Sequence, residues 1–317
     1  MNFQTVTGPV PVEAVGLADG HAHVWIAPQN GVAPDVRIEL HDYDRIEAEL
    51  RDFRALGGTL LIDCQPGGAG RDTTKLAALS RATGLHITAT TGFHRRMYYP
   101  PDDWLWSATE DEAAAYFVEE LTAGTRESGG TIRATTIKVG YEGTPEGQTR
   151  VLMEAVAEAA RQTGVLVLFH TEAGRNVEAL LPFFSERGVR PTRLYLCHVD
   201  KRPDLGLHRE LAQAGVLLGY DTFARPKYNP EQGVWKLLPA LAAEGLGKHI
   251  AICLDLAFPE QWQHYGGGPG LQFLPTQVLP RLRAEGIDEA TMARLTGGNI
   301  ARYLVHQSLT HQESHQE

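Results

Sequence analysis

The segment Gly164-Val-Leu-Val-Leu-Phe-His170 is the part of the chain from which the architecture can be inferred. Residues 165–169 are all apolar, and an uninterrupted apolar run of this length is typical of a parallel strand that is covered on both faces. The preceding residues, Arg150–Thr163, have helical periodicity and stop at a glycine, as many helices do. The segment therefore predicts one unit made of a helix, a glycine, a buried strand and a polar residue at the end of the strand.

The same unit recurs along the chain. Seven further apolar runs are predicted to be strands: Val15–Ala18, Thr59–Ile62, His86–Thr91, Thr135–Val139, Leu194–Cys197, Val216–Gly219 and Ile250–Leu254. Segments with helical periodicity lie between the runs: Asp44–Leu56, Asp72–Thr83, Val177–Arg187, Leu207–Gly215, Glu231–Glu244 and Pro275–Glu285. Eight strands that alternate with helices favour a closed α/β barrel, the (β/α)8 or TIM barrel, and an open doubly wound sheet is the alternative.

No linker divides this pattern, so we expect one catalytic barrel domain over residues 1–305. Residues 306–317 are polar and lack periodicity, which is typical of a C-terminal tail. Three histidines of this segment, His306, His311 and His315, are interpreted as ordinary tail residues.

Composition and charge favour a small-molecule enzyme of the cytoplasm. The net charge of −10 argues against nucleic acid and anionic membranes as partners. The chain has neither a secretory signal nor an apolar run long enough to span a membrane. Its three cysteines, Cys64, Cys197 and Cys253, lie in or beside apolar runs without CxxC spacing, which indicates reduced thiols in a reducing compartment.

Ionisable side chains follow the predicted strands at the same structural level. In a barrel the carboxyl ends of all strands meet at one mouth, where catalysis takes place. The residues delivered there are His21, His23, Lys138, His170, His198 and Asp255. One residue separates the first two histidines, so both point to the same side of a strand and can reach one metal ion. Four histidines and an aspartate at matching strand ends predict a metal site.

Lys138 is the unusual member of this set. A metal ligand must be deprotonated, and two divalent cations would repel an ammonium group. An unmodified lysine at this place fits a salt bridge, or the Schiff-base nucleophile of an aldolase-type barrel.

The segments around these residues resemble the phosphotriesterase-like family of the amidohydrolase superfamily, in its lactonase-type branch. The similar segments are Asp19–His23, Cys64–Asp72, Thr91–Phe93, Ile137–Val139, His170–Gly174, His198–Asp200 with Pro203-Asp204, Leu254-Asp255 and Gly298–Arg302. They follow in order from about residue 15 to residue 304, so the resemblance covers nearly the whole chain.

The resemblance implies a centre of two divalent metal ions. It implies that His21, His23 and Asp255 hold one ion and that His170 and His198 hold the other. Lys138 would carry a carboxylate formed with carbon dioxide and bridge the two ions. Zinc is the first choice for such ligands, and manganese, cobalt or iron fit nearly as well. The ions would activate a hydroxide as the nucleophile, and Asp255 would carry its proton to the leaving group.

Loops at the predicted mouth suggest which substrate is bound. Arg225 and Lys227 follow the seventh strand, and two cations at this place suit an anionic group such as a phosphate or carboxylate. The family resemblance implies that Lys227 contacts the phosphate of a sugar lactone and that Tyr98 or Tyr99 lies over the metals. The relatives have basic residues shortly after the aspartate, where this chain has Phe258-Pro259, so a neutral lactone or one with a carboxylate stays open.

The leading hypothesis is therefore the hydrolysis of a lactone ester, in particular a sugar lactone. The alternatives are an organophosphate triester hydrolase on the same metals, a Schiff-base aldolase that uses Lys138, and a barrel that binds a ligand without catalysis. Members of the family are often dimers, so the resemblance allows a homodimer. No segment of the sequence identifies the interface.

Overall fold

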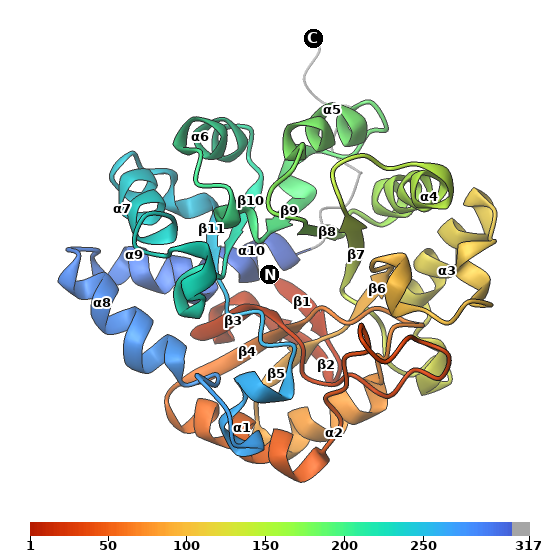
Figure 1. The fold of residues 1–317 in the computed structure, drawn as a ribbon, viewed down its shortest axis with the longest axis horizontal. Coiled ribbons are helices and arrows are strands. Elements are labelled where there is room, and N and C mark those ends of the chain that lie inside the picture. Colours follow the sequence, from red (N-terminus) through yellow and green to blue (C-terminus); the bar gives the residue numbers. More distant parts are fainter. Residues whose placement is uncertain (306–317) are drawn as a thin grey trace.

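A ring of parallel strands lies at the centre of the structure, and helices surround it (Figure 1). The structure is a computed structural model, and it describes residues 1–305. Its barrel strands are β3 (Leu17–Ala22), β4 (Gly58–Asp63), β5 (His86–Thr88), β6 (Thr90–Gly92), β7 (Thr136–Tyr141), β8 (Leu166–Thr171), β9 (Leu194–Cys197), β10 (Leu217–Tyr220) and β11 (Ile250–Ile252). All their pairings are parallel, in the orders β3-β4-β5 and β6-β7-β8-β9-β10-β11.

The predicted third strand is divided into two halves. Only Ala89 separates β5 from β6, yet β5 pairs with β4 while β6 pairs with β7. The two halves together form one barrel strand that passes from one sheet to the other. The eight predicted runs therefore account for all eight barrel strands, although several strands begin or end a few residues from the predicted limits.

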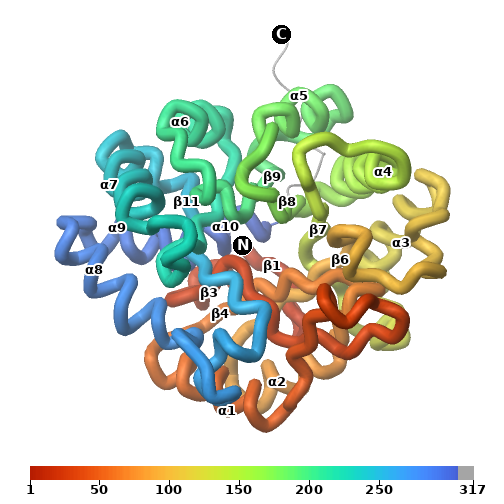
Figure 2. Tube along the Cα trace, in the orientation of Figure 1, coloured from red at the N-terminus to blue at the C-terminus, as the bar shows by residue number. Residues whose placement is uncertain are grey.

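The ring closes between β11 and β3. The Asp255 N–H donates to the His21 carbonyl oxygen at 3.1 Å, and the Leu254 N–H donates to Asp19 Oδ1 at 3.1 Å. The first and last barrel strands also lie side by side in the trace of the chain (Figure 2). The closed barrel is thus the architecture, and the open doubly wound sheet is wrong.

Helices cover the outer face of the barrel. They are α1 (Tyr43–Ala55), α2 (Thr73–Thr83), α3 (Glu110–Thr122), α4 (Gly147–Thr163), α5 (Leu180–Ser185), α6 (Leu205–Gln213), α7 (Val234–Ala243), α8 (Leu279–Ala284), α9 (Glu289–Ala293) and α10 (Asn299–Leu304). The predicted helices at 177–187 and 275–285 begin as a 3-10 turn and a π-helical turn respectively. None of the helices within residues 1–305 combines the length and apolarity that a bilayer crossing requires.

Helix α3 is absent from the predicted elements, although its start is marked in the sequence. Thr109 and Glu112 form a capping box, in which each side chain accepts from the other residue's backbone N–H. Glu120 of this helix forms a buried ion pair with Arg71 at 2.5 Å. Asp72 caps the start of α2, so Arg71 and Asp72 have structural roles.

A short hairpin at the N-terminus is also absent from the predicted elements. Strand β1 (Asn2–Thr5) pairs antiparallel with β2 (Gly8–Pro11). The Val6 N–H donates to the Ile87 carbonyl at 2.9 Å, and Phe3 belongs to the same apolar cluster as Leu304. The hairpin therefore packs on the barrel and on α10, away from the carboxyl ends of the strands.

Candidate metal centre

The six predicted ligands lie at the carboxyl end of the barrel. His21 is in β3 and His23 follows this strand, Lys138 is in β7, His170 is in β8, His198 follows β9, and Asp255 follows β11. Parallel strands of a barrel end at one mouth, and for this reason residues far apart in the sequence can meet there. The structure thus brings together the side chains that the pattern of strand ends selected.

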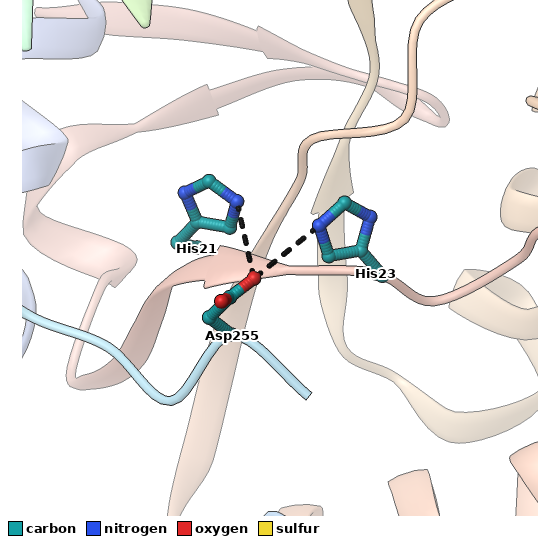
Figure 3. A group of neighbouring side chains, drawn as sticks. All are labelled: His21, His23 and Asp255. Atoms are coloured by element: carbon teal, nitrogen blue, oxygen red, sulfur yellow. Dashed lines mark ion pairs between the residues drawn. The ribbon is translucent and has the colours of Figure 1, made fainter. Parts of the chain in front are cut away.

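His21, His23 and Asp255 form a first cluster (Figure 3). Asp255 Oδ1 lies 3.6 Å from His21 Nε2 and 3.5 Å from His23 Nε2. The ligand atoms of the three residues lie within 4.8 Å of one another. Two imidazole nitrogens and a carboxylate oxygen that converge in this way match the ligand types of zinc and similar ions.

A second cluster joins His198 and Asp255 through Asp221, a residue outside the predicted set. His198 Nδ1 hydrogen-bonds Asp221 Oδ2, and it lies 3.7 Å from Asp255 Oδ2. The His198 ring centroid is 4.9 Å from that of His170. Metal-bound histidines usually donate their second N–H to a carboxylate, which fixes the ring and its tautomer. Asp221 directly follows β10, and this position at a strand end is the sequence feature by which it could have been identified.

Lys138 is fully buried beside these histidines. Its Nζ atom has no hydrogen-bond partner among residues 1–305. An unpaired ammonium in the interior is costly, because burial removes its hydration without replacing it. This environment fits a lysine whose nitrogen is chemically modified, and it leaves an ordinary salt bridge without an acceptor within residues 1–305.

Several other metal-binding atoms of the predicted ligands are also buried and have no hydrogen-bond partner in the described part of the chain, although His21 Nε2 and His170 Nε2 lie 3.6 and 3.7 Å from carboxylate oxygens of Asp255 and Glu172. They are both ring nitrogens of His21 and the Nε2 atoms of His170 and His198. Buried polar atoms almost always have hydrogen bonds, so a group of unpaired ones indicates a bound species. These imidazole nitrogens, together with the Asp255 carboxylate, are of the kind that divalent metal ions select, and the residues therefore fit a metal centre.

Electrostatics keep the ligands in the protonation states that metal binding needs. Burial lowers the pKa of His21 and of His198 well below the usual value, so both rings are neutral. Burial alone would raise the pKa of Asp255, but the positive charge of Arg225 opposes this effect and helps to hold the pKa well below its usual value. Neutral imidazoles and an ionised carboxylate are the metal-binding forms.

Two predicted ligands have strained backbones. His198 has φ 63° and Asp255 has φ 53°, in the left-handed region that residues other than glycine rarely adopt. Such a conformation costs on the order of 1–3 kcal/mol and is frequent at functional sites. The barrel holds both side chains toward the mouth in spite of this cost.

Gln65 orients His23, although no strand-end pattern singles it out. Its Oε1 atom lies 2.8 Å from His23 Nδ1, so Nδ1 carries the proton and Nε2 faces Asp255. The Gln65 amide group is itself held, because its Nε2 donates to the Ala69 carbonyl. Gln65 therefore selects which nitrogen of His23 is available as a ligand.

A cavity of about 240 Å³ opens above the two clusters. His23, His170 and Asp255 form part of its floor. Its walls carry the cations Arg37, Arg95, Lys201, Arg225 and Lys227, together with Tyr98, Tyr228 and Phe258. A concave site with a few converging polar groups is the usual form of a small-molecule binding site.

Of the predicted substrate residues, Lys227 and Tyr98 line this cavity and Tyr99 does not. Tyr99 is buried, its hydroxyl accepts from the His94 N–H at 2.9 Å, and its ring packs on Trp106. Tyr98 and Tyr99 are equal candidates in the sequence. The structure leaves only Tyr98 of the two in a position to contact a substrate.

Arg225 also lines the cavity but is engaged by a metal-ligand candidate. Its Nη2 atom donates to Asp255 Oδ2 at 2.9 Å and to the Leu254 carbonyl at 3.3 Å. A guanidinium that is paired with a carboxylate has less charge to offer a substrate anion. Arg225 therefore supports Asp255, which differs from the anion-binding role expected for it.

Fold and site together define a class of protein. A parallel α/β barrel whose strand ends gather histidines, a buried lysine and an aspartate is a barrel built for metal-assisted chemistry on a small molecule.

Comparison with known proteins agrees with this class. Residues 1–304 match the phosphotriesterase family. A phospho-furanose lactonase of Mycoplasmopsis synoviae is 27% identical over 95% of this chain and 91% of its own length. A phosphotriesterase homology protein of Escherichia coli is 26% identical over 90% of this chain and 96% of its own. The crystal structure of a lactonase from Listeria monocytogenes superposes with a TM-score of 0.90 at 25% identity, over 97% of this chain and 100% of that one.

The chain belongs to the phosphotriesterase family of metal-dependent hydrolases. Both the resemblance stated from the sequence motifs and the prediction of a hydrolase are confirmed. The aldolase-type and non-catalytic alternatives are set aside, since the family match spans the whole barrel.

Proposed function

We propose that this hydrolase opens a lactone ester that carries an anionic group, most simply a sugar lactone with a phosphate or carboxylate. The observation that carries the proposal is the position of two lysine ammonium groups, Lys201 and Lys227, above a cluster of metal-binding donors. The lactonases among the relatives support the ester class.

The metal centre would be binuclear, with His21, His23 and Asp255 as ligands of one ion and His170 and His198 as ligands of the other. Lys138, as a carboxylated side chain, would bridge them, and its buried nitrogen, which has no partner within residues 1–305, supports this assignment. When bound, two divalent ions supply a polarised ester carbonyl and an activated water molecule. Zinc is the first choice, as it was from the ligand types alone.

Asp255 would position the attacking water and take up its proton. Its two carboxylate oxygens have different surroundings, because Oδ1 faces His21 and His23 while Oδ2 faces Arg225. Arg225 thereby holds the carboxylate in one orientation at the floor of the cavity. The proton would pass from Asp255 to the alkoxide that leaves when the lactone ring opens.

The anionic group would lie between Lys201 and Lys227. Three of the five cavity cations already have carboxylate partners: Arg37 with Glu39 at 2.8 Å, Arg95 with Glu142 at 2.7 Å and Arg225 with Asp255 at 2.9 Å. Within residues 1–305, the other two, Lys201 and Lys227, form no ion pair with a carboxylate. Their ammonium groups lie 5.0 and 4.9 Å from the centroid of the Tyr228 ring.

This arrangement accounts for the missing basic residues after Asp255. Phe258 stands there instead and is 46% exposed at the cavity wall. The loops after β9 and β10 supply the two lysines, so anion binding does not depend on the loop after β11.

The direct test is a substrate panel with metal analysis. We expect two metal ions per chain and a higher kcat/KM for phosphorylated or carboxylated lactones than for neutral lactones or aryl phosphotriesters. Asp255→Asn should nearly abolish turnover and keep the metals. Less than about one metal per chain, or a preference for phosphotriesters, would contradict the proposal.

A second test addresses how the two lysines recognise the anionic group of the substrate. Lys227→Met and Lys201→Met should each raise KM for anionic lactones by about tenfold, the effect of about 1.4 kcal/mol of lost binding, and affect neutral lactones much less. The matched control is Lys236→Met, since Lys236 lies on the outer helix α7 and donates to Gln232, which precedes that helix. Equal losses on both kinds of lactone would rule out charge recognition by these lysines.

The cytoplasmic location and the homodimer stay predictions. The tail histidines His306, His311 and His315 lie outside the described residues.

A further inference from the structure

His94 is a buried cavity residue that neither the metal centre nor the anion site uses. It follows β6 and lines the cavity. Its Nδ1 atom accepts a hydrogen bond from the Arg95 backbone N–H at 2.8 Å. A backbone N–H can only donate, so Nδ1 must be unprotonated. The neutral ring therefore carries its proton on Nε2.

The backbone around His94 is held firmly in place. The His94 N–H donates to the Tyr99 hydroxyl at 2.9 Å. Gly140 of β7 lies directly beneath this loop, because a Cβ atom there would stand 2.6 Å from the Arg95 nitrogen and 3.1 Å from the His94 Cα. The absence of a side chain at Gly140 thus lets the loop approach the strand that carries Lys138.

The ring lies beside the candidate metal ligands. Its centroid is 4.9 Å from that of His170 and 4.6 Å from that of Tyr98, which also lines the cavity. Within residues 1–305, Nε2 of His94 makes no hydrogen bond. The side chain is largely buried but lines the cavity, so an N–H there that lacks a protein partner is available to a bound molecule.

A direct role as a metal ligand does not fit this ring. Ligation through Nε2 needs the lone pair of that nitrogen, and the proton assigned above occupies it. Ligation through Nδ1 would require the loss of the bond from Arg95. The ring is therefore a hydrogen-bond donor next to the metals.

We propose that His94 is a catalytic residue whose Nε2–H donates a hydrogen bond to the carbonyl oxygen of the bound ester. Negative charge develops on this oxygen when water attacks the carbonyl carbon, and a fixed donor stabilises that charge. The proton stays on Nε2, because an imidazolate would be too basic to form, so His94 moves no proton. A neutral imidazole that polarises a carbonyl is known from other barrel enzymes.

This inference rests on the proposed ester hydrolysis and adds a donor to it. Removal of one oxyanion donor typically lowers kcat by about 10²–10³-fold. His94→Phe, which fills the space without a donor, should show such a loss on the best ester substrate of the wild type. His94→Gln places an amide N–H near the position of Nε2 and should recover part of it.

Metal content and a control variant separate this role from a structural one. Both His94 variants should keep the two metals of the wild type, and His41→Phe, at an exposed position, should match the wild-type kcat. A kcat for His94→Phe within about threefold of the wild type would overturn the inference. A kcat loss in proportion to metal loss would overturn it as well.

The tautomer can be measured without activity. In protein labelled with ¹⁵N-histidine, the signals that disappear in His94→Phe should show a protonated Nε2 and an unprotonated Nδ1. The opposite tautomer would overturn the inference even if the enzyme proved to be a lactonase. A wild type that opens no lactone would contradict the proposed function, while the kcat test could still be run on any ester that is hydrolysed.

Discussion

At the scale of single residues, the site depends on which nitrogen each histidine presents. Gln65 fixes the tautomer of His23, Asp221 that of His198 and the Arg95 backbone that of His94. Each of these partners binds Nδ1 and leaves Nε2 directed to the centre of the site. For His23 and His198, which are metal-ligand candidates, partners of this kind commonly change metal affinity by about 10–100-fold.

Gln65→Leu should therefore weaken metal binding by about 10–100-fold, because Nδ1–H of His23 loses its acceptor. Competition with a chelator of known affinity measures the effect. Gln29→Leu is the matched control, since Gln29 lines the same cavity but bonds the carbonyls of Ala27 and Pro28. Equal metal affinity of the two variants would show that Gln65 does not orient the ligand.

His208 predicts a pH dependence of stability. It lies on the buried face of α6, next to β10, where Nε2 bonds the Arg202 carbonyl and Nδ1 bonds the Tyr220 hydroxyl. Burial lowers the pKa of His208 from 6.5 to about 4 in the folded protein. As the pH falls, its imidazole is therefore protonated in the unfolded chain before it is protonated in the folded protein. Stability should decrease between about pH 6.5 and pH 4 by roughly 3 kcal/mol from this group. Denaturant unfolding of His208→Gln should show a smaller decrease over that range.

At the scale of elements, the close contact between strands β6 and β7 positions Lys138 and the loop that contains His94. Gly92 pairs with Lys138 and has φ +96°, and a Cβ atom at this position would lie 2.2 Å from the Lys138 carbonyl oxygen. Close approach of the two strands thus depends on glycine. The same holds further along β7, where Gly140 admits the backbone of His94.

Gly92→Ala should destabilise the protein by more than about 4 kcal/mol or prevent soluble expression, because the backbone of β7 cannot move away. Gly57→Ala is the control, since Gly57 has the same φ of +96° and no atom of the described residues lies within 4 Å of a Cβ there. The left-handed conformation alone should cost about 1–2 kcal/mol at that position. Similar unfolding free energies for the two variants would refute the steric argument.

At the scale of the whole molecule, the barrel closes on a cluster of unpaired polar groups. His21, Lys138, His170 and His198 each have a buried nitrogen that makes no hydrogen bond within residues 1–305. Buried polar atoms without hydrogen bonds destabilise the folded protein, and a bound cation would give these atoms a partner. Metal binding should therefore contribute to folding stability.

Removal of the metals by chelation should lower Tm by at least about 5 °C, and added metal should restore it. One ion at about 100 times its Kd stabilises by roughly 2.7 kcal/mol, and 1 kcal/mol moves Tm by a few degrees in proteins of this size. His23→Asn should show a smaller shift, because it lacks one ligand. An unchanged Tm after verified metal loss would contradict this account.

The strand pattern, and the residue that stands at each strand end, can be read from the amino-acid sequence. Apolar runs report burial, and a histidine, lysine or aspartate at or shortly after the end of a run needs only the barrel topology to reach the mouth. For this reason the pattern of runs selects all six metal-ligand candidates. It does not reveal breaks within elements, such as Ala89 between β5 and β6, because an apolar run carries no sign of a change in pairing partner.

The contacts of each side chain at the mouth, in contrast, follow from the tertiary arrangement alone. Arg225 turns to Asp255, Tyr99 packs inward on Trp106, and His94 enters the cavity over Gly140. Neighbouring loop residues share the same local sequence signal, while several of their partners come from strands tens of residues away. A hydrogen-bond partner is a property of the folded chain, so no local pattern could assign it.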